Sequence, residues 1–301
     1  MSRYIFLILI FIISCQPIKE VDIWKVYYFG GQSNMDGYGH NSKLPDSLKK
    51  VIPNSMIFNG YRQNQGFPKG GIGIWAPVEP GHGYLFETNG ASNNLSDLFG
   101  PELSFANVLE KDSEKIAIIK YSFGGSSLYP SAGYGDWNPD QMRRNHYDNA
   151  LSTINNAYEI KDINGDGRLD RLIPHGIIWM QGESDAKYSQ KSADSYLENL
   201  KDLMALLRAA LRNENLPVVI GKINDSYMTP DGKPTQPFID IVHSAQKGFT
   251  DMDGCASYVT EIESYEFSDD AWHYDTDGFI RMGIAFAKAV KKLESECLGI
   301  N

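Results

Sequence analysis

Five short apolar runs, each bounded by glycine or polar residues, recur along the chain. They span residues 23–29, 115–121, 176–180, 218–220 and 256–259. The runs are nearly continuous and rich in β-branched and aromatic side chains, which is typical of strands buried on both faces. We therefore expect five strands of one parallel sheet, because parallel sheets are usually covered on both sides.

Helical periodicity fills several of the intervals between these runs. Residues 100–109 read as a helix with proline in its first turn, and residues 276–293 as the closing helix. Between about Ser192 and Arg212, apolar residues share one helical face: Tyr196, Leu200, Leu203, Leu207 and Leu211. Alternating strands and helices predict a three-layer α/β/α sandwich around a flavodoxin-like, five-stranded parallel sheet. Neither an internal repeat nor a linker divides residues 15–301, so we expect a single domain.

A long segment rich in glycine, proline and asparagine, residues 36–100, interrupts this alternation. Loops of this length inside a compact domain are uncommon and usually functional. Aromatic residues among the glycines suit a surface on which sugars stack, and Trp75 and Tyr84 are candidates for it. Packing of the same aromatics onto the domain is the alternative.

The composition narrows the classes of function. The chain has 301 residues, a formal charge of −10 and 42% hydrophobic residues. That hydrophobic content can build a full core, so the chain is not disordered. Basic residues are nowhere concentrated enough to form a nucleic-acid surface, and we expect no nucleic-acid partner.

The first residues form a separate signal. Arg3 precedes an uninterrupted apolar run over residues 4–13, which is too short to span a bilayer comfortably, and Cys15 follows. The pattern resembles a bacterial lipoprotein signal over residues 1–14, with Cys15 as the lipidated first residue of an outer-membrane or cell-surface protein. Gln16 fits outer-membrane sorting. A plain secretory signal, giving a periplasmic or secreted protein, is the alternative.

Two further cysteines, Cys255 and Cys297, have no neighbouring ligand at metal-binding spacing. In an oxidising compartment they could pair, but two cysteines define no framework. We interpret them as structural and leave their pairing open.

Polar residues follow three of the predicted strands. Ser33 follows the first, Gly124-Gly125 the second and Gln181-Gly182-Glu183 the third. The carboxyl ends of parallel strands meet at one edge of a sheet, where ligands bind. These residues should therefore converge at one site.

A carboxylate and a histidine lie just before the closing helix. Asp270 is three residues ahead of His273, a spacing that lets the carboxylate hold the imidazole Nδ1–H and leaves Nε2 to accept a serine proton. The neighbouring Asp269 could take the place of Asp270, because adjacent carboxylates on a turn cannot be ranked without geometry.

Together these motifs resemble the SGNH-hydrolase superfamily. Gly-Gln-Ser-Asn-Met-Asp-Gly at residues 31–37 and Trp-Met-Gln-Gly-Glu-Ser-Asp-Ala at residues 179–186 are specific as a pair. Within the superfamily the chain looks like the sialate O-acetylesterase-type and acetylxylan-esterase-type carbohydrate esterases, over about residues 24–290. No Gly-x-Ser-x-Gly elbow is present, which argues against an α/β-hydrolase fold.

The resemblance assigns a catalytic triad and an oxyanion hole. It implies Ser33 as nucleophile, His273 as general base and Asp270 as the group that orients the base. The oxyanion donors would be the Ser33 N–H, the N–H of Gly125 or Gly124, and the side-chain amide of Gln181, which stands where the superfamily has asparagine. Four more residues would brace the site by hydrogen bonds: Gln32, Asn34, Glu183 and Asp185.

Residues 162–170 resemble the first nine positions of a calcium-binding loop. The candidate ligands are Asp162, Asn164, Asp166 and Asp170. The twelfth position is Ile173, where such loops place a bidentate carboxylate, so we expect poor affinity at best. The same residues also make a good turn.

The sequence thus predicts an exported, lipid-anchored serine esterase that deacetylates carbohydrates through an acyl-serine intermediate. Its partner would be an acetylated oligo- or polysaccharide, its contact with the membrane only the lipid anchor, and it would need no cofactor. The alternatives are a non-catalytic carbohydrate-binding lipoprotein and an esterase of short-chain lipid or aryl esters.

Overall fold

The computed structural model describes residues 21–61, 70–112, 114–130, 132–141 and 144–299. The expected signal over residues 1–14 and the lipidation site Cys15 lie outside these residues. No helix in the described part of the chain combines the length and apolarity needed to cross a membrane.

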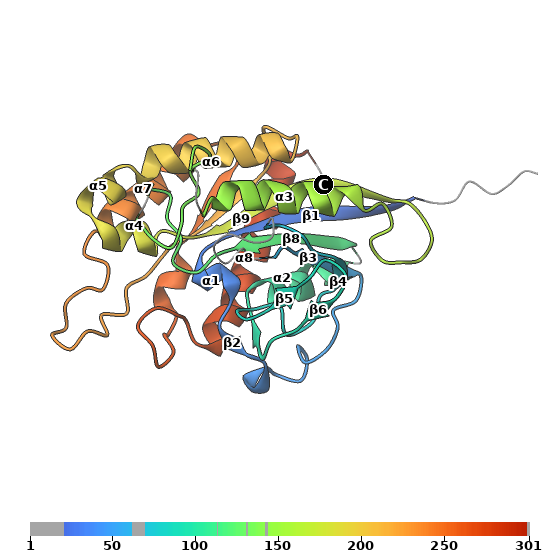
Figure 1. Ribbon diagram of the computed structural model, residues 1–301, viewed down its shortest axis with the longest axis horizontal. Coiled ribbons are helices and arrows are strands. Elements are labelled where there is room, and N and C mark those ends of the chain that lie inside the picture. Colours follow the sequence, from blue (N-terminus) through green and yellow to red (C-terminus); the bar gives the residue numbers. More distant parts are fainter. Residues whose placement is uncertain (1–20, 62–69, 113, 131, 142–143, 300–301) are drawn as a thin grey trace, which may run out of the picture.

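A seven-stranded sheet forms the middle layer (Figure 1). Its order is β11 (Ala256–Val259), β10 (Val218–Gly221), β9 (Asp170–Met180), β1 (Asp22–Gly31), β8 (Ile116–Ser122), β3 (Ser55–Asn59) and β4 (Trp75–Pro77). All neighbours pair in parallel except β4, which runs antiparallel to β3. The prediction of an α/β fold around a parallel sheet is confirmed except at the antiparallel β4, but the prediction of five strands is wrong.

The two additional strands come from the segment over residues 36–100. Only three apolar residues in a row, Met56 to Phe58, mark β3, and β4 is three residues long. The same segment also contributes two small two-stranded sheets, β2 (Gly39–His40) with β7 (Leu98–Phe99) and β5 (Glu87–Thr88) with β6 (Asn93–Asn94). The segment is therefore less of a loop than its composition suggests.

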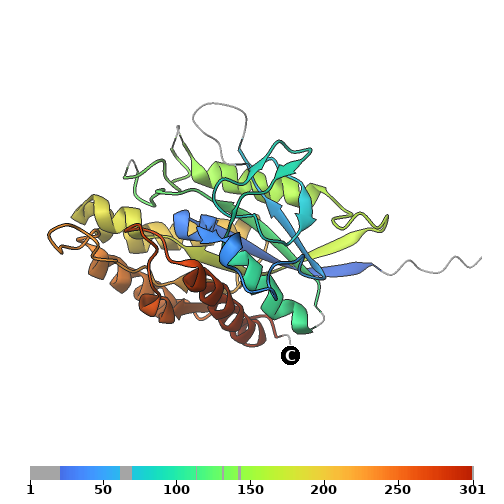
Figure 2. The same ribbon diagram turned by 90° about the horizontal axis from the view of Figure 1, so that it is seen from below.

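Helices cover both faces of the sheet. On one face α2 (Glu102–Leu109) packs against α8 (Thr276–Cys297); Figure 2 views the sheet from an edge, with this pair of helices on the lower side of the strands. On the other lie α3 (His146–Glu159), α6 (Tyr196–Ala210) and α7 (Ile239–Met252). Short helices complete the set: α1 (Ser33–Asp36), α4 (Glu183–Tyr188), α5 (Gln190–Asp194), and the 3₁₀ turns η1 (Asn41–Lys43), η2 (Glu110–Asp112) and η3 (Glu261–Ser264).

A disulfide joins Cys255 and Cys297, whose Cα atoms are 5.8 Å apart. It ties the start of β11 to the last residue of α8. The pairing that the sequence left open is thus made between the edge strand β11 and a helix that covers one face of the sheet.

Strand register brings three strand ends to the same level. Gly31, the last residue of β1, lies opposite Ser122 of β8 on one side and Met180 of β9 on the other. The chain leaves all three strands at this edge. The residues that follow β1, β8 and β9 are therefore neighbours, although they lie about 60 to 150 positions apart in the sequence.

Candidate active site

The turn after β1 presents Ser33. Gly31 has a φ of +148°, and a Cβ there would lie 2.0 Å from the Met180 carbonyl oxygen, so only glycine fits. The same carbonyl accepts a hydrogen bond from the Gln32 N–H at 3.0 Å. Ser33 then begins α1 at the edge of the sheet.

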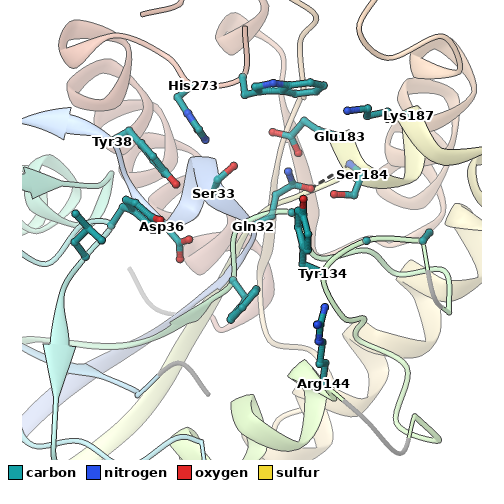
Figure 3. Close-up of a pocket in the computed structure, with 18 of the residues that line it drawn as sticks. Gln32, Ser33, Asp36, Tyr38, Tyr134, Arg144, Glu183, Ser184, Lys187 and His273 are labelled. Carbon is teal, nitrogen blue, oxygen red and sulfur yellow. Dashed lines mark hydrogen bonds between the residues drawn. The ribbon is translucent and has the colours of Figure 1, made fainter. Parts of the chain in front are cut away.

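A cavity of about 1130 Å³ opens above this turn. Figure 3 shows Ser33 and His273 on its wall, with the imidazole directed toward the serine. Gly124 and Gly125 also line it, and a Cβ built on Gly124 would lie 3.5 Å from the Ser33 Cβ. The structure thus brings together the expected nucleophile, the expected base and both candidate glycines.

His273 is held by Asp270. Its Nδ1 lies 2.8 Å from Asp270 Oδ2, while Asp270 Oδ1 accepts the N–H groups of Trp272 (2.7 Å) and His273 (2.8 Å). No hydrogen bond among the described residues uses the Asp269 carboxylate. Burial raises the pKa of Asp270, but the hydrogen bonds from His273 and the backbone outweigh it, so this pKa lies below its usual value. The geometry selects Asp270 as the partner of His273.

The imidazole is also fixed by stacking. The Tyr38 ring lies parallel to it, with 3.6 Å between centroids and 6° between planes, and Tyr84 stacks on the other side of Tyr38 at 4.6 Å. Both tyrosines line the cavity. Tyr84 was expected at the site, whereas Tyr38 was not, because nothing local distinguishes it from a packed aromatic.

The other five histidines lie elsewhere, and none lines the cavity. They are His40, His82, His146, His175 and His243. Burial lowers the pKa of His82 to about 3 and that of His146 to about 4, so both are neutral at physiological pH. His273 is therefore the histidine that the fold brings to the cavity.

Asn34 links two strand-end turns. Its Nδ2 donates to Glu183 Oε1 at 2.8 Å and to the carbonyl oxygen of Trp272 at 3.0 Å, next to His273. Glu183 is buried and lines the cavity. Burial raises its pKa to about 7, against the lowering effect of the Asn34 hydrogen bond. Asn34 thus connects α1 to Glu183 and to the backbone next to His273, and the bracing role of these two residues stays a prediction.

Gln181 departs from expectation. Its side chain is fully buried and does not line the cavity, since Nε2 donates to the Ser126 carbonyl oxygen (3.2 Å) and to Asp185 Oδ2 (2.7 Å). This donor is already engaged inside the protein. The structure therefore does not bring Gln181 to the cavity with the other expected oxyanion donors.

Asp185 organises the loop after β8. Its carboxylate accepts four hydrogen bonds, from Leu128 N (2.9 Å), Tyr129 N (2.8 Å), Gln181 Nε2 and Ser192 Oγ (3.1 Å). Burial nevertheless raises its pKa to about 6. Asp185 supports the residues around the site through these hydrogen bonds and does not line the cavity.

The buried ion pair between Lys120 and Glu102, which lies next to α1, was not predicted from the sequence. Lys120, in the middle of the apolar strand β8, binds Glu102 Oε2 at 2.8 Å and the carbonyl oxygens of Asp36 (2.9 Å) and His82 (3.0 Å). The Asp36 carboxylate lines the cavity and accepts the Ser122 hydroxyl at 2.6 Å. The sequence feature that could have predicted this ion pair is Lys120 itself, because a charged side chain inside a buried strand must be paired.

Of the two aromatics proposed to contact sugar, only one reaches the cavity. Trp75 is buried on β4, its Nε1 donating to the Ala157 carbonyl oxygen at 3.0 Å, and it packs at the edge of Phe58. Tyr84 does line the cavity, with several aromatics from other loops. These are Tyr38, Tyr61, Phe86, Phe123, Tyr134, Tyr188 and Trp272.

The candidate calcium loop is closed by its own hydrogen bonds. The Asp162 carboxylate accepts the N–H groups of Gly165, Asp166 and Gly167, and Asp166 pairs with Arg168. Across the described ranges, no group of three or more His, Cys, Asp or Glu side chains is arranged to hold a metal ion. Calcium binding stays a prediction.

Fold and site together define an α/β/α hydrolase whose serine follows the first strand. The chain belongs to the family described as carbohydrate esterase, sialic acid-specific acetylesterase, whose model matches residues 24–292. No curated protein matches the chain in sequence.

Solved structures resemble it in fold. A protein from Arabidopsis thaliana is 18% identical, with a TM-score of 0.63 and coverage of 89% of this chain and 98% of its own. NanS is 17% identical, with a TM-score of 0.60 and coverage of 93% and 100%. A carbohydrate acetylesterase from Xanthomonas citri is 17% identical, with a TM-score of 0.57 and coverage of 92% and 57%.

Proposed function

We propose that this chain is a serine esterase that removes acetyl groups from carbohydrate hydroxyls. The observation that carries the proposal is the placement of Ser33 and His273 on the wall of one cavity, with Asp270 bound to the imidazole, in a member of a carbohydrate-esterase family. A serine, a histidine and an orienting carboxylate are the groups that ester hydrolysis needs.

The reaction follows from this arrangement. Ser33 Oγ attacks the acetyl carbonyl carbon and passes its proton to His273 Nε2, because Asp270 holds the opposite ring nitrogen. The sugar oxygen leaves with that proton, and an acetyl-serine remains. Water, deprotonated by His273, then releases acetate and restores the serine. No step uses a cofactor.

The size and lining of the cavity support a carbohydrate as the alcohol part of the ester. An acetyl group fills little of about 1130 Å³, and the walls carry several tyrosines that can stack on sugar rings. Lys187 and Arg144 also line the cavity, and such cations pair with carboxylates. Acidic acetylated sugars such as sialic acids, which the family's name includes, are therefore the first substrates to test.

Acetate release from acetylated sialic acids, xylan and pectin tests the proposal, with Ser33→Ala as the matched control. Release that depends on Ser33 supports it. A chain that binds these sugars and releases no acetate would instead be a carbohydrate-binding protein.

A series of 4-nitrophenyl esters tests the acyl group separately. Each buried CH₂ contributes about 0.8 kcal/mol only where an apolar groove receives it, so we expect the rate to fall at least about tenfold from acetate to octanoate. Equal or faster hydrolysis of the octanoate ester would favour the lipid-esterase alternative.

We further propose that the enzyme acts outside the cytoplasm as a lipoprotein anchored through Cys15. The lipoprotein-like signal motivates this, and the Cys255–Cys297 disulfide supports it, since such bonds persist in oxidising compartments. Cys15→Ala should move the protein from the membrane fraction to the soluble fraction. A wild-type protein that is already soluble would contradict the anchor.

A further inference from the structure

We propose that the side-chain amide of Gln32 donates a hydrogen bond to the oxyanion of the reaction, the role that the sequence resemblance gave to Gln181. The inference rests on the proposed ester hydrolysis. It starts from two glutamines at neighbouring strand ends. Gln32 precedes Ser33 and lines the cavity, whereas Gln181 does not line it.

The orientation of the Gln32 amide is set by its neighbours. One terminal atom faces the backbone N–H groups of Gly182 (3.5 Å) and Ser184 (3.4 Å). Because both groups can only donate, the atom that faces them must be the oxygen, Oε1. The other terminal atom is therefore the NH₂ group, a donor with two hydrogens.

The NH₂ group is directed into the cavity. Figure 3 shows the Gln32 amide beside Ser33, with Oε1 turned toward Ser184 and the nitrogen on the side of Ser33 and Glu183. None of the hydrogen bonds recorded among the described residues uses Gln32 Nε2. The amide is thus fixed through its oxygen and leaves its donor available next to the serine.

Gln181 is arranged in the opposite way. Its Nε2 is engaged by the Ser126 carbonyl oxygen and by Asp185, and the whole side chain is enclosed. To reach a substrate it would have to break both hydrogen bonds and leave the Asp185 carboxylate with one donor fewer. Gln32 needs no rearrangement, and a preorganised donor is what stabilises an oxyanion best.

Gln32 acts when the bond between Ser33 Oγ and the carbonyl carbon forms. The π electron pair of the carbonyl moves onto its oxygen, and the serine proton moves to His273. The Gln32 NH₂ then donates to that negative oxygen, and the hydrogen bond weakens again when the sugar oxygen departs and the carbonyl re-forms. The same electron and proton movements occur when water attacks the acetyl-serine, so both steps of the reaction use the Gln32 donor.

The first test compares Gln32→Leu and the isosteric Gln32→Glu with the wild type on 4-nitrophenyl acetate. Removing one oxyanion donor should lower kcat by about 10²- to 10³-fold. KM should change by less than about threefold, because the donor acts on the transition state rather than on the bound ester. Gln32→Asn, which keeps an NH₂ on a shorter arm, should recover part of the loss.

Inhibitor binding separates this role from a structural one. Phenylboronic acid forms a tetrahedral adduct on serine, so its inhibition constant should rise by about the same factor as kcat/KM falls in Gln32→Leu. Inhibition by acetate, which resembles no transition state, should stay within about threefold. An equal weakening of both would overturn the proposal, since it would mean a general disturbance of the cavity.

Gln181→Leu provides the comparison variant. The proposal is overturned if Gln32→Leu stays within about threefold of the wild type while Gln181→Leu, still folded, loses about 10²-fold or more. If Gln181→Leu does not fold, the Gln32 variants decide alone. A wild type that hydrolyses no acetyl ester would contradict the proposed function, whereas an active wild type with an unaffected Gln32→Leu contradicts only this inference.

Discussion

Two turns at the same edge of the sheet carry similar side chains in opposite environments. The His273 turn (residues 268–274) is closed by a hydrogen bond from Ser268 N to His273 O, and it presents His273, which Asp270 holds, to the cavity. The Glu183 turn (residues 181–185) is almost wholly buried. The first turn can move protons and meet substrate, while the second holds the loops around it in place.

The difference shows in the carboxylates. Hydrogen bonds outweigh burial at Asp270 and lower its pKa, whereas burial outweighs hydrogen bonds at Glu183 and raises its pKa to about 7. Residue type alone therefore does not assign a role. The partner that each carboxylate holds does: Asp270 binds the imidazole of a cavity residue, whereas Asp185 binds buried donors inside the protein. This difference predicts which substitutions affect rate and which affect stability.

The largest expected effect is that of His273→Ala on rate. Loss of the base should lower kcat/KM for 4-nitrophenyl acetate by about 10⁴-fold or more, because members of a triad act as a unit. The variant also loses the stacking on Tyr38 and the hydrogen bond to Asp270, together about 1–3 kcal/mol, so circular dichroism should first show that it is folded at the assay temperature. Ser244→Ala, on the exposed side of α7, is the control for substitution as such. A His273→Ala variant with a near-wild-type rate would show that the His273 turn takes no part in the chemistry.

The next effect distinguishes two neighbouring carboxylates. Asp270→Asn should lower kcat by about 10²- to 10⁴-fold, since the amide cannot hold the imidazole tautomer that the reaction needs. Asp269→Asn should stay within about twofold, because its carboxylate is exposed and has no recorded hydrogen bond. Steady-state kinetics of the pair give the answer, and the reverse order would transfer the orienting role to Asp269.

The Glu183 turn should show its effect in stability. Asp185→Ala leaves buried donors without their partner, among them Leu128 N and Ser192 Oγ, and each such group costs about 1–3 kcal/mol. We expect a loss of about 2–5 kcal/mol in the free energy of unfolding, measured with urea. A variant as stable as the wild type would mean that these hydrogen bonds do not support the fold.

The smallest expected effect is a dependence of the free energy of unfolding on pH. Because the folded-state pKa of Glu183 lies above its unfolded value of 4.5, the folded protein binds the extra proton, and this stabilisation is lost as pH rises through about 7. The free energy of unfolding of the wild type, minus that of Glu183→Gln, should therefore fall between pH 5 and pH 8, by at most about 1.4 kcal/mol per pH unit.

Asp166 supplies the control for that slope. The hydrogen bond from the Arg168 side chain lowers the pKa of Asp166 to about 2, so its contribution to stability is present above the unfolded value and is lost only as pH falls below about 4. Because Arg168 keeps its charge throughout, the difference between wild type and Asp166→Asn should be flat from pH 5 to pH 8. A difference for Glu183→Gln that is equally flat would contradict a raised pKa.

Much of the fold could be predicted because strands buried on both faces leave a clear apolar signal. All five expected strands are present, and four of them have bounds within two residues of those expected. The strand β9 begins six residues earlier than its apolar run, because Arg171 and His175 interrupt the pattern while the backbone continues to pair. The short strands β3 and β4 left too little signal among glycines and prolines.

The site could be predicted in part. The convergence of parallel strand ends predicts the place of Ser33, and the spacing of Asp270 and His273 predicts their hydrogen bond. The sequence did not predict the direction in which individual side chains point. The Gln181 side chain donates a hydrogen bond to Ser126, about 55 residues away in the sequence, and the Trp75 side chain donates one to Ala157 of α3. The residues next to Gln181 and Trp75 in the sequence do not indicate either orientation.

The acetylation state of Ser33 during turnover tests the central claim most directly. The enzyme would be mixed with 4-nitrophenyl acetate, quenched in acid within the first turnovers and digested, and the peptide containing Ser33 examined by mass spectrometry. We predict one acetyl group on Ser33, present transiently in the wild type and absent from Ser33→Ala. Hydrolysis at an undiminished rate in Ser33→Ala, or acetate release with no acetyl group ever found on Ser33, would contradict the account.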